Sequence, residues 1–266
     1  MIFKLKKYQS LLFSILLALI TAAGGFYIYK CTNYAPWGFS DSATYIASAR
    51  NLANGAGLGS FQVDGSFTPL QIFAPLYSIV LSVFAIIKVD LVLAAAILDI
   101  LLFMVLIAAG GWLFWRLSGS IVSALCFASL IVFSPALIHD YTSIMSEPLA
   151  ITLGMVGFLV LLVSMTRKST GGLVASALLI GLALLSRYAF AAYAAAGILC
   201  LLLFSSNTWR KRGSDALLFG LISILPLVIW FLIQFLGTRS IGSRHYSMEF
   251  SIIEKLKQFF TMAYDV

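Results

Sequence analysis

The sequence predicts an all-α polytopic membrane protein. Of its 266 residues, 61% are apolar and only 10% are charged, and the mean hydropathy is +1.02. A soluble domain is roughly half apolar and a quarter charged, so this chain lacks the polar surface that a soluble enzyme needs. Its apolar residues also form long continuous runs rather than alternating patterns, which favours spanning helices over a membrane β-barrel.

The apolar runs give the expected spans, because a helix needs about 20 apolar residues to cross a bilayer. The first run follows a basic N-terminus and is long enough to be an uncleaved span rather than a secretory signal. We expect about seven transmembrane helices, at residues 11–29, 91–112, 121–138, 148–163, 172–185, 189–204 and 216–236. The run 75–87 is shorter and begins with proline, so two interpretations stay open, a strained span or a helix in the interface.

Basic residues decide between these interpretations, because cytoplasmic loops carry an excess of lysine and arginine. If 75–87 does not cross and the N-terminus is cytoplasmic, the cytoplasmic segments hold one acid, Asp215, and these basic residues: Lys4, Lys6, Lys7, Arg116, Arg167, Lys168, Arg210, Lys211 and Arg212. If 75–87 crossed, most of them would move outside. We therefore expect a juxtamembrane helix at 75–87 on the outer face. The formal charge of +7 then reflects basic loops and not a nucleic-acid partner.

This orientation gathers the unusual polar residues on the outer face. The segments there are the large first loop 30–90, the short loop 139–147 and the tail from residue 237. We expect residues 1–236 to form the transmembrane module. Residues 237–266 would be an outer-face tail, or the start of a further loop.

The first outer loop contains a predicted helix that begins near Ser40 and ends at Gly55. Helical spacing puts Asp41 and Tyr45 on one face and Arg50 on another. A carboxylate just beyond the membrane surface can act as a general base or bind a hard divalent cation. The simpler alternative is that Asp41 only stabilises the N-terminus of its helix.

The second outer segment carries a further set of acidic residues. Glu147 precedes a proline that starts the next predicted span, and His139 and Asp140 lie a few residues earlier. Asp41, Glu147 and His139 are candidate ligands of a divalent cation, although their spacing follows no closed motif. The alternative is that Glu147 only caps its helix.

Cationic residues form the third candidate group. Arg187 interrupts the apolar stretch 173–204, and a charge at such a place indicates a function. The tail adds Arg239, Arg244 and His245. Arginine binds phosphate well through its planar fork of donors, so this group suits a lipid-linked phosphate. The alternative is that these side chains extend to lipid headgroups.

Taken together, these segments resemble the GT-C superfamily of membrane glycosyltransferases. Within it, they are similar to the dolichyl-phosphate-mannose protein mannosyltransferase and aminoarabinose transferase group, which has many bacterial members. The matching pieces, in the family's order, are DSATYIASARNLANGAG from Asp41, APLYS around Pro75, SEPLA from Ser146, LALLSRYAF around Arg187 and GSRHYS from Gly242. The resemblance implies a GT-C-like helix bundle with juxtamembrane helices in its first outer loop, in a bacterial inner or plasma membrane.

The resemblance also implies an activity, the inverting transfer of a sugar from a polyprenyl-phosphate donor to a lipid, glycan or protein acceptor on the outer face. The roles it implies are as follows: Asp41 as catalytic aspartate; Glu147 and Asp140 as the second acidic motif; Arg187, Arg239, Arg244 and His245 as donor-phosphate contacts; Tyr45 and Arg50 as loop support. Two departures matter. Asp41 is flanked by serines where many members carry adjacent acids, which weakens the case for a divalent cation as cofactor. The chain is also shorter than most members, so the resemblance implies that it lacks their C-terminal part.

Two other classes of function stay open. A transporter or flippase would place charged residues near the midplane of the bilayer, where Asp99 and Arg187 are the candidates, but the sequence shows no repeat. A truncated, non-catalytic partner of an active enzyme is the second. No phosphate-binding loop of the P-loop or Rossmann type is present.

Overall fold

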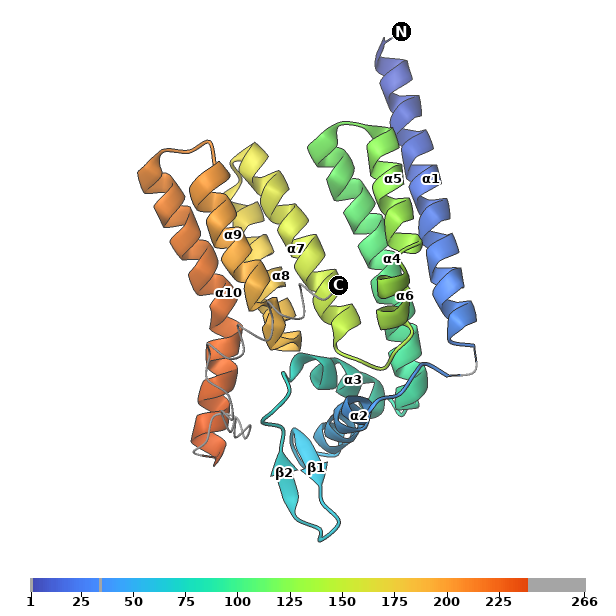
Figure 1. Cartoon of the computed structure of the whole chain (residues 1–266), viewed down its shortest axis with the longest axis vertical. Coiled ribbons are helices and arrows are strands. Elements are labelled where there is room, and N and C mark those ends of the chain that lie inside the picture. Colours follow the sequence, from blue (N-terminus) through green and yellow to red (C-terminus); the bar gives the residue numbers. More distant parts are fainter. Residues whose placement is uncertain (1, 34, 239–266) are drawn as a thin grey trace, which may run out of the picture.

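The computed structural model describes residues 2–33 and 35–238, and this part of the chain is mostly helical (Figure 1). The long helices run side by side, and the smaller elements gather at one end of them. The elements are α1 (Ile2–Cys31), α2 (Ser40–Ala53), β1 (Gly59–Phe61), β2 (Phe67–Pro69), α3 (Leu76–Ile86), α4 (Leu91–Ser118), α5 (Ile121–Val132), α6 (Pro135–Tyr141), α7 (Glu147–Arg167), α8 (Thr170–Ser186), η1 (Tyr188–Phe190), α9 (Ala191–Phe204) and α10 (Trp209–Thr238).

Several of these helices have the length and composition of membrane spans. Within the described residues, α1, α4, α7 and α10 each meet both criteria, and the bent pair α5–α6 makes a fifth if it is one span. The apolar windows of the four are only 22–44% buried, so most of their apolar surface faces outward, as in helices surrounded by lipid. This agrees with an integral helical membrane protein. By the length criterion alone, fewer than the expected seven spans are found among the described residues, because α8 and α9 are shorter than a full span.

The predicted continuous span at 121–138 is wrong in one respect. Helix α5 ends at Val132, and α6 begins at Pro135 after a bend of 57°. A proline cannot donate a backbone hydrogen bond and disfavours helical geometry at the residue before it. Ser134 instead caps the new helix, because its hydroxyl accepts from the N–H of Leu137 at 3.5 Å.

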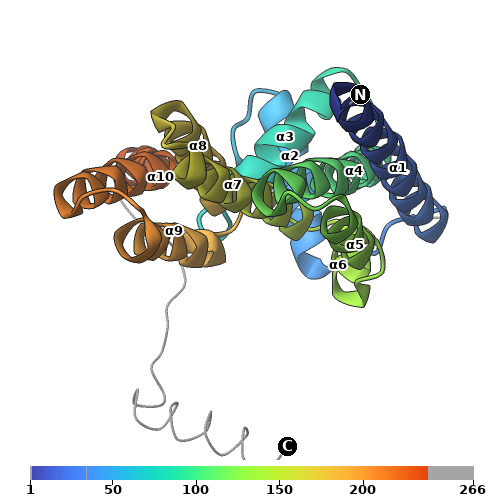
Figure 2. The same ribbon diagram turned by 90° about the horizontal axis from the view of Figure 1, so that it is seen from above.

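The helices pack as two groups, which meet where α4 contacts α7 (Figure 2). The first group, α1, α4 and α5, surrounds a core that includes Phe13 and Phe103. The second, α7 to α10, surrounds Leu161 and Phe219. Gly181 lets α8 and α10 approach closely, because a Cβ at this position would lie 2.8 Å from a backbone oxygen of α10. Small residues at helix contacts are typical of packing in membranes.

The long loop between α1 and α4 folds into α2, a two-stranded ribbon and α3, all at one end of the bundle (Figure 1). Helix α2 agrees with the predicted helix, and Gly55 has the positive φ of +79° that suits its end. The expected cap is displaced by one residue, because Phe39 is the N-cap and its N–H donates to the hydroxyl of Ser42 at 2.9 Å. Helix α3 has 11 residues, too few to cross a bilayer of about 30 Å.

The ribbon of β1 and β2 is an element that the sequence analysis did not predict. The strands are antiparallel, with Gly59 opposite Pro69. Asp64 and Gly65 form the turn between them, and Gly65 has a φ of +81°. An Asp-Gly pair between short apolar segments is typical of a hairpin.

The two ends of the bundle differ in charge. The start of α1 and the turns α4–α5, α7–α8 and α9–α10 lie at one end (Figure 1). Those turns carry Arg116, Arg167, Lys168, Arg210, Lys211 and Arg212, against the single acid Asp215. The opposite end, with α2, the ribbon and α3, carries charges of both signs: the acids Asp41, Asp64, Asp90, Asp140 and Glu147, and the basic residues Lys30, Arg50, Lys88 and Arg187. The basic loops that the sequence analysis assigned to one side of the membrane therefore do share one end of the fold.

Candidate functional site

Main-chain hydrogen bonds join the first and second loops at the end of the bundle opposite the basic turns. The N–H of Trp37 donates to the carbonyl of Thr142, and the N–H of Ile144 donates to the carbonyl of Trp37, each at 2.8 Å. The hydroxyl of Ser42 donates to the carbonyl of Ile144 at 2.6 Å. The first turn of α2, which carries Asp41, is therefore fixed to the segment that precedes α7.

Ser146 connects three helices at the same place. Its hydroxyl shares a hydrogen bond of 3.0 Å with the hydroxyl of Tyr45 on α2, and its carbonyl accepts from the hydroxyl of Ser186 at 3.1 Å. The hydroxyl of Ser78 on α3 donates to the carbonyl of Tyr45 at 3.3 Å. All four residues are buried. The polar groups at this end thus form one connected set rather than separate capping contacts.

Arg187 and Glu147 form an ion pair. Arg187 has an extended backbone at the break between α8 and η1, and its Nη1 contacts Oε1 of Glu147 at the start of α7. The side chain of Glu147 is 18% exposed and that of Arg187 is 41% exposed. The negative charge of Glu147 is thus compensated by a cation, while part of the guanidinium stays accessible.

A cavity of about 230 Å³ brings the main candidates together. Asp41, Tyr45, Ser186, Arg187 and Tyr188 supply its polar lining, and Ile72, Phe73, Ala74 and Ala189 complete it. These residues come from α2, the 72–74 segment, the end of α8 and η1. Among the described residues Asp41 forms no ion pair, and its Oδ1 accepts a hydrogen bond of 3.3 Å from its neighbour Ser40. The cavity therefore combines an unpaired carboxylate with a partly accessible guanidinium.

Tyr45 is held as a neutral hydrogen-bonding group in this cavity. Burial raises its pKa above the ordinary value, the hydrogen bond with Ser146 opposes this, and the carboxylates of Glu147 and Asp41 raise it further. Each carboxylate disfavours a second negative charge nearby. The ring of Tyr45 packs edge-on against that of Tyr77, with centroids 5.1 Å apart. Tyr45 thus positions α2 and keeps a hydroxyl that can donate.

The structure does not bring all of the predicted residues into this cavity. Arg50 is exposed on α2 and lies outside the cavity lining. His139 and Asp140 contact one another, with Nδ1 and Oδ1 3.4 Å apart, and their side chains are 71% and 33% exposed. The remaining predicted phosphate contacts, Arg239, Arg244 and His245, lie outside the described residues.

The proposed metal ligands do not converge within the described part of the chain. No group of three or more histidine, cysteine, aspartate or glutamate residues is found there that could hold a metal ion. Glu147 is engaged by Arg187, and His139 contacts Asp140 instead. Of the three candidate ligands, only Asp41 lines the cavity. The structure therefore does not bring the three candidate ligands together.

Helix α10 supports the cavity through residues that the sequence analysis missed. The hydroxyl of Tyr188 donates to the carbonyl of Phe73 at 3.3 Å and accepts from Nε1 of Trp230 at 3.2 Å. Nε2 of Gln234 donates to the carbonyl of Leu70 at 2.8 Å. The available signal was weak: a tyrosine that directly follows the arginine interrupting an apolar stretch.

A second cavity of about 190 Å³ adjoins the first and shares Ile72 and Phe73 with it. Its polar lining is uncharged and consists of Thr44, Ser48, Ser60, Thr68 and Gln71. The hydroxyl of Ser48 is buried and has no hydrogen-bond partner among the described residues. The two cavities thus differ in chemistry, one charged and the other lined by hydroxyl and amide groups.

Asp99 lies apart from both cavities. It is fully buried on α4, and neither of its carboxylate oxygens has a hydrogen-bond partner among the described residues. The hydroxyl of Tyr77 is likewise buried without a partner there. A buried carboxyl of this kind is the feature that the transporter interpretation needs.

Comparison with known proteins adds no assignment to this description. No protein-family model matches the chain, and no curated protein matches it. Function therefore has to be inferred from the chemistry of the residues that line the site.

Proposed function

We propose that this chain is a membrane glycosyltransferase that takes a sugar from a polyprenyl-phosphate-linked donor and transfers it, with inversion, to an acceptor on the outer face of the membrane. One observation carries the proposal: Asp41 and Arg187 line a single cavity at the end of a bundle of membrane-length helices. The resemblance of the Asp41, Ser146 and Arg187 segments to the GT-C superfamily supports the same activity.

Arg187 is the group proposed to bind the donor phosphate. The lipid phosphate that leaves is a stable anion, so a fixed cation beside it lowers the barrier more than an acid would. The contact with Glu147 holds the guanidinium in one orientation, and a planar arginine fork can still offer its other donors to a phosphate. Glu147 is therefore a positioning residue. Arg239, Arg244 and His245 are proposed to complete the phosphate site.

Asp41 is the proposed general base. Its carboxylate takes the proton of an acceptor hydroxyl or amine as the acceptor atom bonds to the anomeric carbon. The bond between that carbon and the phosphate oxygen breaks on the opposite face of the sugar, and the phosphate leaves with the electron pair. The absence of an ion pair at Asp41 among the described residues supports this role, since a paired carboxylate is a weaker base.

The neighbouring uncharged cavity supports binding of the acceptor next to the donor. Hydroxyl and amide groups suit a polar neutral ligand, and Ser48 offers an unpartnered hydroxyl there. A lipid, a glycan or a protein side chain could each present such a group. Since the three candidate ligands do not converge among the described residues, no step of the proposed reaction is assigned to a metal.

The proposed topology has seven spans in a bacterial inner or plasma membrane. Besides the four long helices, α5–α6 would make one span, and α8 and η1–α9 would make two more. Helix α8 has 17 residues, which corresponds to about 25 Å at 1.5 Å per residue. The basic end would be cytoplasmic by the positive-inside rule, so the N-terminus would be inside and the cavity of Asp41 outside.

Replacing Asp41 with asparagine tests the proposal directly. Membranes containing the chain are incubated with a radiolabelled polyprenyl-phosphate sugar, and transfer to endogenous acceptors is measured. We expect D41N to lose transfer by about 10²–10⁴-fold, the usual contribution of a general base, while the protein stays folded. Asp64→Asn is the matched control, because Asp64 lies on the ribbon away from the cavity. Transfer by D41N at the wild-type rate would remove Asp41 from the mechanism.

A transporter or flippase is the second candidate, and the buried, unpartnered Asp99 favours it. Asp99→Asn distinguishes the two candidates. Under our proposal this variant keeps transfer, because Asp99 lines neither cavity. Transport would be supported instead if D99N lost substrate movement across the bilayer while D41N kept normal sugar transfer. A truncated non-catalytic partner would show neither activity in purified form.

A further inference from the structure

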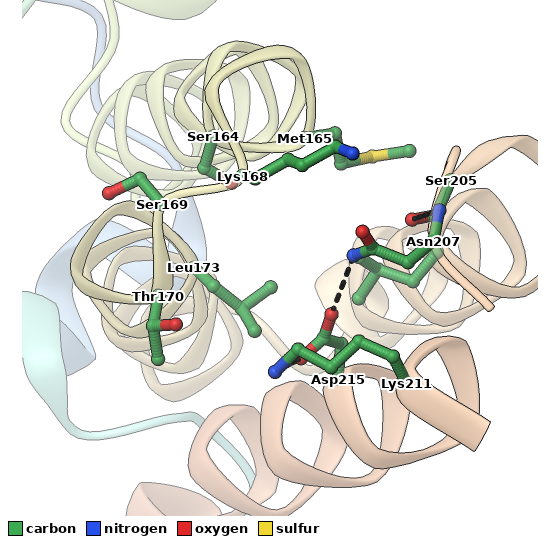
Figure 3. A pocket seen from close by; sticks show the side chains of 11 residues that line it. Ser164, Met165, Lys168, Ser169, Thr170, Leu173, Ser205, Asn207, Lys211 and Asp215 are labelled. Carbon is green, nitrogen blue, oxygen red and sulfur yellow. Dashed lines mark hydrogen bonds and ion pairs between the residues drawn. The ribbon is translucent and has the colours of Figure 1, made fainter.

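A third pocket lies at the basic end of the bundle, away from Asp41. Figure 3 shows it between the α7–α8 turn and the α9–α10 turn. Its volume is about 80 Å³, and its two cationic side chains are Lys168 and Lys211. They reach it from different elements, Lys168 from the α7–α8 turn and Lys211 from α10 (Figure 3). Its polar lining includes Thr170, Ser205, Asn207 and Asp215.

The only acid in this lining is buried and compensated. The side chain of Asp215 is 9% exposed, and its two oxygens contact Nζ of Lys211 at 2.7 Å and Nδ2 of Asn207 at 3.2 Å. The hydroxyl of Ser205 accepts from the N–H of Asn207 at 3.3 Å, which fixes this group. Both lysines are exposed. The pocket therefore presents a net positive charge on an ordered polar wall.

Lys168 occupies a backbone position that suits glycine better. It ends α7 with a left-handed φ of 52°. Glycine is preferred at such helix ends, because it has no Cβ to clash in this conformation. The chain thus has a lysine at a strained position at the mouth of the pocket. Strain of this kind is typical of positions with a functional role.

The surroundings of the pocket have the features of a membrane boundary. Exposed apolar side chains continue along α9 and α10 from the pocket, with Leu203 59%, Phe204 76% and Leu217 64% exposed. Trp209 is 72% exposed, and the guanidinium of Arg212 lies 5.1 Å from its ring centroid. Tryptophan and basic residues are enriched where helices meet lipid headgroups. A ligand here could contact both an apolar surface and the two lysines.

We propose that this pocket binds the phosphodiester headgroup of an anionic phospholipid, with the ammonium groups of Lys168 and Lys211 as its ligands and the acyl chains against α9 and α10. Basic pockets between spanning helices at the end rich in lysine and arginine are suited to such headgroups. The hydroxyl of Thr170 at the start of α8 points toward the pocket (Figure 3) and can donate to the same phosphate. This site is separate from the transferase site and does not depend on the proposed activity.

Native mass spectrometry of the purified full chain tests the proposal. The protein is delipidated in neutral detergent, and phosphatidylglycerol, phosphatidylcholine or inorganic phosphate is added in separate experiments. We expect phosphatidylglycerol to bind in preference to phosphatidylcholine. A lysine near a lipid phosphate contributes about 1 kcal/mol, so removal of one lysine should weaken phosphatidylglycerol binding about fivefold.

Lys168→Gly is the decisive variant, because a fold defect cannot explain its expected result. Glycine relieves the left-handed backbone at this position, so the variant should be at least as stable as the wild type while it binds phosphatidylglycerol about fivefold more weakly. Lys211→Gln should show the same loss, but it also leaves Asp215 without its cation and is read together with a stability measurement. Arg116→Gln is the control, since Arg116 is a basic residue at the same end and outside the pocket.

Two outcomes would overturn the proposal. Unchanged binding of phosphatidylglycerol by K168G, or an equal loss in R116Q, would mean that the pocket does not select the lipid. Binding of inorganic phosphate with the same dependence on both lysines, and with no preference between the two lipids, would assign the site to a free anion. Neither outcome bears on sugar transfer, which is measured separately with D41N.

Discussion

Replacing Arg187 with methionine should destabilise the fold through the partner that it leaves behind. The carboxylate of Glu147 is only 18% exposed and would remain there without its cation. Breaking a fully buried ion pair costs about 3–5 kcal/mol, whereas an exposed pair is worth about 1 kcal/mol or less. Because 41% of the Arg187 side chain is exposed, we expect R187M to lower the free energy of unfolding by about 1–2 kcal/mol.

A double-mutant cycle with Glu147→Gln separates this pairing from other effects. E147Q removes the charge that needs a partner, so the double variant should be nearly as stable as E147Q alone, with a coupling energy of about 1 kcal/mol. Unfolding of the chain by SDS in mixed micelles, followed by helical circular dichroism, gives the four free energies. The coupling should weaken as salt is added, because part of the pair is exposed.

The control for this cycle is Arg116→Met. Arg116 lies at the opposite end of the bundle, where its guanidinium is 5.1 Å from the ring centroid of Trp112, so it should be additive with E147Q. Additivity of R187M and E147Q within about 0.3 kcal/mol would refute the pairing and with it the positioning role of Glu147. In the transfer assay R187M should lose more activity than E147Q, because only Arg187 is proposed to contact the donor phosphate.

Three further predictions concern the elements around the cavities. Tyr45→Phe removes the 3.0 Å hydrogen bond to Ser146 but keeps the ring, so SDS unfolding should show a loss of about 1 kcal/mol; no loss would mean that the bond is not formed. Gly59→Ala should separate the ribbon strands, because its Cβ would lie 2.3 Å from a backbone oxygen of β2, and faster proteolysis of residues 59–69 would report this. The hydroxyl and N–H of Ser66 hydrogen-bond Asp64 and lower its pKa. These bonds therefore favour the turn above the carboxyl's unfolded pKa and are lost as pH falls through the lowered folded value, which an NMR titration of the turn amides would follow.

Charged residues at the ends of apolar runs were the most informative part of the sequence. Burial of a charge in lipid is costly, so Asp41, Glu147 and Arg187 were expected at the ends of helices. The number of membrane crossings then predicted that all three lie at the same end of the bundle. Helical spacing also put Asp41 and Tyr45 on one face of α2, and both line the cavity. These conclusions need only periodicity and hydropathy, which are local properties of the chain.

The pairing of Arg187 with Glu147 could not be read from the sequence. The two residues are far apart in the chain, and the sequence analysis gave them separate roles, one as a phosphate ligand and the other in an acidic motif. Which charges neutralise one another depends on how α7 and α8 pack, and that packing buries Glu147 to 18% exposure beside the guanidinium. His139, by contrast, contacts a residue next to it in the chain, Asp140, so this contact does not depend on helix packing.

Other differences had signals in the sequence that the hydropathy pattern concealed. Residues 121–138 are apolar almost throughout, so they were interpreted as one span, yet Ser134 and Pro135 form a cap and a helix start. Asp64 and Gly65 are a typical hairpin turn, but the strands beside them have three residues each. Strands that short have no periodicity to detect. Turn chemistry therefore carries more information than hydropathy in loops of a membrane protein.

The position of Asp41 depends on a segment about one hundred residues away in the chain. Ser42, one residue later, donates its hydroxyl to the carbonyl of Ile144, and the backbone of Trp37 pairs with Thr142 and Ile144. Backbone groups make most of these contacts, so they do not depend on which side chains the partner residues carry. The loop that bears the proposed base is thereby fixed to the start of α7, where Glu147 orients Arg187. A disturbance of this backbone pairing would move the base and the cation relative to one another, and would impair transfer without altering either residue.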